Sequence, residues 1–133
     1  MIDRGLWALT GACIAITLWF SFVASVPGAD VFTFADKVGH GIAYFATTLS
    51  FLFAAVWRPG RGWGRFTSLN RWFPVAAIVG GVIIEILQEA VFVRSAELYD
   101  VVAEVIGTSA AVVVHELIRR RMRSSITDAS SRA

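Results

Sequence analysis

The sequence has few of the features that stabilise a small soluble fold or mark a known chemistry. Its one cysteine, Cys13, excludes an intrachain disulfide. The longest stretch between apolar runs, 58–73, holds only 16 residues, which excludes a separate soluble domain. There is no internal repeat, glycine-rich phosphate loop, cofactor fingerprint or Gly-x-Ser-x-Gly nucleophile motif. Function therefore has to be sought in individual polar residues.

Apolar residues, in contrast, are in excess. They make up 56% of the 133 positions, and the mean hydropathy is +0.66, whereas soluble domains are roughly 45–50% apolar. Four apolar runs, at 6–26, 38–57, 74–93 and 98–118, each approach the ~20 residues with which a helix spans ~30 Å of hydrocarbon. The sequence therefore predicts an integral membrane protein.

Residues 1–123 are predicted to form a single all-α domain, a polytopic bundle of four antiparallel transmembrane helices. Strands are disfavoured because an open sheet leaves its backbone unsatisfied in lipid, and no alternating pattern suits a barrel. The first run exceeds the roughly 7–15 apolar residues of a signal peptide, so we expect a retained helix. At the inner end of the last helix, His115 and Glu116 are expected to reach the headgroups or pair with the following arginines. The polar tail, 124–133, is expected to be flexible.

Basic residues are distributed unevenly about the four runs. If the runs alternate across the membrane, only Lys37 and Arg94 fall on one side. The ten on the other side are Arg4, Arg58, Arg61, Arg65, Arg71, Arg119, Arg120, Arg121, Arg123 and Arg132. The positive-inside rule then places both termini and segment 58–73 in the cytoplasm, in a bacterial inner membrane. The basic tail suits anionic headgroups, and no nucleic-acid partner is predicted.

Most of the other ionisable residues lie at the opposite, outward end of the runs. An ionisable group in hydrocarbon costs several kcal/mol unless it finds a partner or water, so we expect these residues to meet in one site. The candidate ligand-binding residues are Asp36, Lys37, His40, Tyr44, Glu85, Gln88, Arg94, Asp100 and Glu104.

Helical spacing indicates which of these residues share a face. Asp36, His40 and Tyr44 are each four residues apart and form one stripe on the second helix. Polar and small residues line up on the last helix, namely Asp100, Glu104, Gly107 and Ala111. Because Gly80 and Gly81 allow close approach, we predict that the third and fourth helices form the tightest pair.

The pattern of these residues resembles the VanZ-like family of small bacterial membrane proteins. The matching residues are Asp-Lys-x-x-His at 36–40, Tyr44, Glu-x-x-Gln at 85–88, Arg94, Asp100 and Gly107. Their order and spacing match over most of the chain. The resemblance implies a link to low-level resistance to the glycopeptide teicoplanin, and it carries the polar signature of the family onto these positions. Where the family usually has Asn, three residues before Gly107, this chain has Glu104, which adds a carboxylate.

Several interpretations of the site remain open. The favoured one is recognition or handling of an envelope lipid, lipid-linked precursor or cell-wall-directed molecule, with Lys37 and Arg94 engaging phosphate. A second is hydrolysis or group transfer. The catalytic candidates are then His40 as general base or acid, Asp36 as its orienting partner, and Glu85. Whether the protein is an enzyme is left open.

Two further interpretations involve no lipid chemistry. His40 and the neighbouring carboxylates would suit zinc or manganese more than copper, but His-x-x-x-His and Glu-x-x-His spacings are absent. No metal or cofactor is therefore predicted. In the last interpretation, the protein is a small accessory subunit that packs against a larger membrane protein complex, and the polar cluster holds its helices in register. Membrane lipids are the other expected partners.

Overall fold

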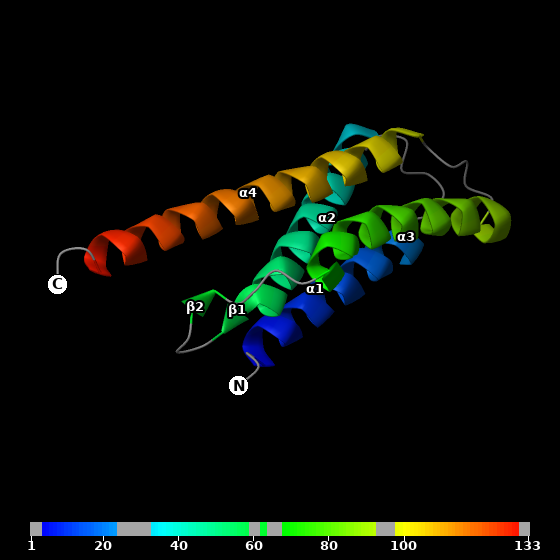
Figure 1. Ribbon diagram of the computed structural model, residues 1–133. Helices are drawn as coiled ribbons and strands as arrows, with labels where there is room; N and C mark the ends of the chain where they lie inside the picture. Colours follow the sequence, from blue (N-terminus) through cyan, green and yellow to red (C-terminus); the bar gives the residue numbers. More distant parts are fainter. Residues whose placement is uncertain (1–3, 24–32, 59–61, 64–67, 93–97, 131–133) are drawn as a thin grey trace.

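A computed structural model describes residues 4–23, 33–58, 62–63, 68–92 and 98–130 (Figure 1). The helices are α1 (Arg4–Val23), α2 (Thr33–Val56), α3 (Ser68–Phe92) and α4 (Leu98–Ser130). Between α2 and α3, the two-residue strands β1 (Trp57–Arg58) and β2 (Gly62–Trp63) pair antiparallel. The predicted all-α class is confirmed. The antiparallel order of the helices in a membrane and the cytoplasmic termini stay predictions.

Three of the helices are long and apolar enough to cross a membrane. Their candidate spans are Lys37–Val56, Asn70–Leu87 and Leu98–Met122. In α1 the described apolar stretch, Arg4–Trp19, is shorter, so its crossing of the membrane stays a prediction. Many large apolar side chains of all four helices are exposed, which is the surface that a lipid environment accommodates.

Three helices extend beyond the apolar runs that predicted them by five residues or more. α2 begins at Thr33, five residues before 38. α3 begins at Ser68, six residues before 74, and contains Pro74 in its interior. α4 continues to Ser130, through most of the segment assigned to the polar tail. Hydropathy marks where a helix is apolar, and polar residues with adequate helix propensity can continue the same helix beyond that point. On α4, Glu116 forms ion pairs with Arg119 and Arg120 at 2.8 Å and 2.7 Å, as the sequence predicted for Glu116.

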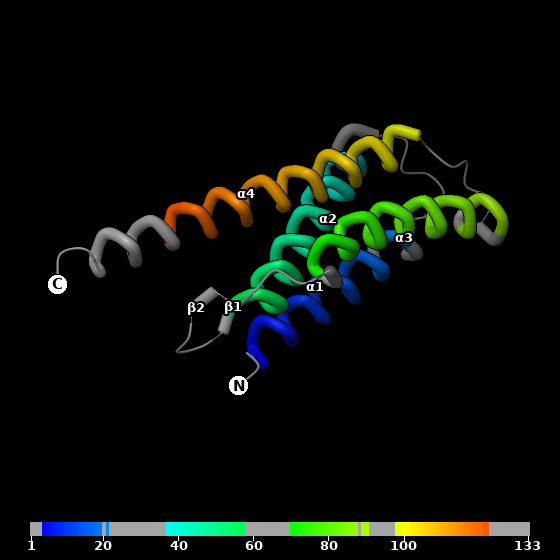
Figure 2. The backbone as a smooth tube through the Cα atoms, viewed as in Figure 1, coloured from blue at the N-terminus to red at the C-terminus, as the bar shows by residue number. Residues whose placement is uncertain are grey.

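α2 is the central helix, and it contacts each of the other three helices (Figures 1 and 2). Its most extensive interface is with α4, where the backbones approach so closely that a Cβ atom on Gly107 would overlap the carbonyl of Gly41. The prediction that α3 and α4 form the tightest pair is therefore wrong. Small residues identify a surface that permits close approach, but the sequence of one helix does not say which neighbour uses that surface.

α1 packs against α2 through polar and aromatic contacts. The hydroxyls of Thr17 and Thr47 are 3.1 Å apart. The ring of Phe51 meets Trp7 of α1 edge-on at 5.6 Å and stacks on Phe73 of α3 at 3.5 Å between centroids. This aromatic group joins three helices toward the end of the molecule where the N-terminus and the β1–β2 strands lie (Figure 1).

Candidate functional site

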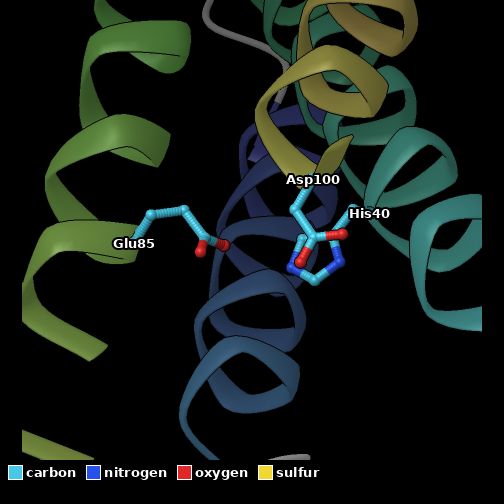
Figure 3. Close-up of side chains that lie close together, drawn as sticks. All are labelled: His40, Glu85 and Asp100. Carbon is cyan, nitrogen blue, oxygen red and sulfur yellow. The ribbon is translucent and has the colours of Figure 1, made fainter. Parts of the chain in front are cut away.

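Three ionisable side chains from three different helices meet at the other end of the bundle. They are His40 of α2, Glu85 of α3 and Asp100 of α4, and one potential ligand atom of each lies within 4.8 Å of the other two. Figure 3 shows His40 and Asp100 next to each other, with the carboxylate of Glu85 directed toward them from α3. Glu85 and Asp100 are 4% and 0% exposed. The structure thus brings together residues separated by up to 60 positions in the chain.

Asp100 reaches the site from the N-terminal end of α4. Asp100 lies in the first turn, where a carboxylate interacts favourably with the helix dipole. The Nζ atom of Lys37 donates a hydrogen bond of 3.3 Å to its Oδ1 atom. The Lys37 side chain is 21% exposed, whereas that of Asp100 is fully buried. Lys37 therefore lies at the edge of the site and compensates part of its negative charge.

Glu104 lies one helical turn beyond Asp100 and extends the site toward α3. It is 1% exposed, and its carboxylate accepts a hydrogen bond from the hydroxyl of Tyr44. The same carboxylate packs against Gly81 of α3, where a Cβ atom would overlap Glu104 and lie 2.7 Å from the Tyr44 Oη atom. Gly81 therefore leaves the space that the carboxylate occupies. Within the part of the chain that the structure describes, the Oε2 atom of Glu104 has no hydrogen-bond partner.

The described side chains make this site strongly acidic. Glu85, Asp100 and Glu104 supply three carboxylates, Lys37 supplies one ammonium, and His40 is neutral or cationic according to its protonation state. Electrostatic interactions link Glu104 with His40, Glu85 and Asp100. Since all these residues lie within candidate membrane spans, their charges cannot be screened as on a water-exposed surface. Such a site can bind a cation or donor groups of a polar ligand.

The other predicted site residues cannot be placed as fully. Tyr44 joins the site through Glu104, as its spacing from His40 suggested. Asp36 and Gln88 are described only as parts of α2 and α3, without their side chains, and Arg94 lies outside the described residues. The proposed roles of Asp36 in orienting His40, and of Arg94 in binding phosphate, therefore stay predictions.

Sequence analysis missed the burial of several polar residues along the same helices. Thr48, Thr108 and His115 are 0%, 1% and 1% exposed. Thr108 and His115 continue the helical spacing of Asp100, Glu104 and Ala111, which is the signal that identifies them. His115 was expected to reach the headgroups or pair with the following arginines. The first alternative does not hold in the structure, where His115 is buried and its ring meets Phe53 edge-on at 5.4 Å.

Comparison with known proteins does not assign the chain to a family. No family model, curated protein or solved structure matches it. The resemblance to the VanZ-like family therefore stays a prediction. The structure supports a coarser class, an all-helical, membrane-compatible protein with a buried acidic site between α2, α3 and α4.

Proposed function

We propose that the protein binds the polar head of an envelope lipid or lipid-linked precursor at the site between α2, α3 and α4. The observation that carries this proposal is the convergence of His40, Glu85 and Asp100 within candidate membrane spans. Ionisable residues at such positions are costly, and they commonly mark a binding or transport site. In this proposal the protein is a VanZ-like protein of a bacterial inner membrane, and its site faces outward.

A lipid fits both the polar and the apolar surroundings of the site. Lys37 is partly exposed at its edge and is suited to a phosphate, while the carboxylates can accept hydrogen bonds from hydroxyl or amine groups. The helices that carry these groups also carry exposed apolar side chains, including Ile42 of α2 and Ile86 of α3, which are 62% and 58% exposed. A ligand with one polar end and one apolar chain satisfies both surfaces.

Native mass spectrometry of the gently solubilised protein tests this proposal. The wild-type protein, delipidated and then supplied with phosphatidylglycerol, phosphatidylethanolamine or undecaprenyl phosphate, is expected to retain one of them at one molecule per chain. Glu85→Gln and His40→Ala should reduce the retained fraction at least tenfold. Glu89→Gln is the matched control, because Glu89 lies one turn along α3 and is exposed. Retention that does not change in Glu85→Gln and His40→Ala would contradict the proposal.

The second candidate function is that of an accessory subunit in a larger membrane protein complex. The length of α4 favours it, since the helix has 33 residues and continues past the span that ends at Met122. Figure 1 shows the C-terminal part of α4 extending past the other three helices. In this case the polar cluster stabilises the bundle. Glu85→Gln would then lower protein abundance, and a large assembly would survive gentle extraction without any bound lipid that depends on the site.

A further inference from the structure

The three converging side chains form a set of metal ligands that their spacing along the chain did not reveal. We propose that His40, Glu85 and Asp100 bind one divalent cation of the zinc or manganese type. They supply one imidazole nitrogen and two carboxylate oxygens, all within 4.8 Å of one another. This inference goes beyond lipid binding and does not rest on it.

The distances allow binding after a small movement of the side chains. Ligands of a tetrahedral Zn²⁺ ion lie about 2.0–2.2 Å from the metal, and therefore roughly 3.4 Å from one another. Glu85 has several rotatable bonds and extends from α3 toward the other two residues (Figure 3). Because the three ligand atoms lie within 4.8 Å of one another, movements that shorten each separation by no more than about 1.4 Å bring them to this spacing.

A second observation beside the triad also indicates a cation. Glu104 is 1% exposed, and among the described residues its buried Oε2 atom has no hydrogen-bond partner. Leaving such an oxygen unsatisfied costs about 1–3 kcal/mol or more. Glu104 interacts electrostatically with all three members of the triad. Its unsatisfied oxygen is an acceptor beside the triad for a donor such as a metal-bound water.

The ligand types narrow the choice of metal. Mg²⁺ and Ca²⁺ prefer sites made only of oxygen ligands, so the imidazole of His40 argues against them. Copper favours softer or nitrogen-rich sites, and the one cysteine of the chain lies in α1. One imidazole and two carboxylates suit Zn²⁺ and Mn²⁺. A bound cation would also provide the positive centre that this acidic site needs in order to hold a phosphate.

Metal binding can be measured on the full chain in detergent. The protein is stripped with a chelator, dialysed against ZnCl₂ or MnCl₂, and analysed for bound metal by mass spectrometry. We expect one ion per wild-type chain and at least tenfold weaker binding in His40→Ala and Glu85→Gln. Glu89→Gln, an exposed carboxylate on the same helix, is expected to bind as tightly as wild type. A folded wild-type protein without a stoichiometric ion, or binding unchanged in both variants, would overturn the proposal.

A measurement on nearly wild-type protein covers the case in which the ligand variants do not fold. The chain has two histidines, His40 and His115. Pulsed electron paramagnetic resonance of bound Mn²⁺ should detect coupling to an imidazole nitrogen in both wild type and His115→Gln. Loss of this coupling in His115→Gln, or its absence from wild type, would show that His40 is not a ligand. If the metal assays use delipidated protein and the lipid-retention assay is repeated with a chelator, failure of metal binding is distinguishable from failure of lipid binding.

Discussion

Gly107 of α4 packs directly against the backbone of Gly41 of α2, leaving no room for even a Cβ atom at position 107. On α4, Gly107 follows Glu104 by about one helical turn, and on α2 Gly41 directly follows His40. The close approach of the two backbones therefore fixes how α4 presents Asp100 and Glu104 to α2. In this way an apolar packing contact determines the geometry of the polar site.

Replacement of Gly107 by alanine should destabilise the bundle. The added Cβ atom meets backbone atoms, which cannot move aside as a flexible side chain can, and such overpacking costs about 1–3 kcal/mol. Gly39→Ala is the matched control, since a Cβ atom there has nothing within 4 Å and alanine favours the helix by up to about 1 kcal/mol. Denaturation in detergent followed by circular dichroism measures both effects. Equal stability of Gly107→Ala and Gly39→Ala would show that the backbones of α2 and α4 do not approach as closely as described.

Replacement of Gly81 by alanine should disturb the site with little loss of helix. The new methyl group would occupy the space of the Glu104 carboxylate and approach the Tyr44 hydroxyl. We expect zinc affinity to fall at least tenfold while helix content is unchanged. Gly80→Ala, one position earlier, introduces the same methyl group with nothing within 4 Å and should bind zinc normally. Normal binding by Gly81→Ala would mean that Glu104 does not contribute.

Removal of the Lys37 ammonium should leave a buried carboxylate poorly compensated. Lys37→Gln is expected to destabilise the protein by about 1–3 kcal/mol, because Asp100 is fully buried. The double variant Lys37→Gln, Asp100→Asn should recover part of this loss. Arg120→Gln is the control, since Arg120 is 75% exposed in its pair with Glu116 and such pairs contribute about 0–1 kcal/mol. Strictly additive effects in the Lys37 and Asp100 cycle would argue against their ion pair.

The hydroxyl pair of Thr17 and Thr47 should contribute measurably to the packing of α1 on α2. The Thr17 hydroxyl donates to the carbonyl of Cys13, so Thr47 is the donor between the helices. A double-mutant cycle with Thr17→Val and Thr47→Val should give a coupling near 0.6 kcal/mol. Thr10→Val provides the control, because the Thr10 hydroxyl bonds only to Leu6 of its own helix among the contacts described. A coupling of zero would show that the bond does not form in the membrane.

The predicted orientation can be tested independently of the site. In a Cys13→Ser background, Tyr99→Cys at the start of α4 should react with a membrane-impermeant maleimide on intact cells. Gly62→Cys, in β2 between α2 and α3, should react only after the membrane is permeabilised. This result follows from the excess of arginine on the predicted cytoplasmic side. The reverse labelling pattern would place the polar site in the cytoplasm and remove the basis for an outward-facing role.

Much of the site could be predicted because apolar runs and helical spacing, the two features that locate it, are local properties of the sequence. Apolar runs located α2, α3 and α4, and spacing along α4 placed Asp100 and Glu104 on one face. The helix ends were predicted less well. The start of α3 at Ser68 and the continuation of α4 to Ser130 involve polar residues, which hydropathy alone does not distinguish from loops. The burial of His115 was not predicted, because the depth of a residue in a bundle depends on neighbouring helices, which the sequence of one segment does not show.

The sequence by itself determined that the chain is helical and membrane-compatible, and which polar residues lie within its apolar segments. Only the tertiary structure decided that α4 packs most extensively on α2, and that His40, Glu85 and Asp100 converge within 4.8 Å. The physical reason is that hydropathy and helical periodicity are properties of one segment. The choice of a partner depends on the fit of two surfaces, and here that fit rests on Gly41 and Gly107, which leave space for two backbones to meet.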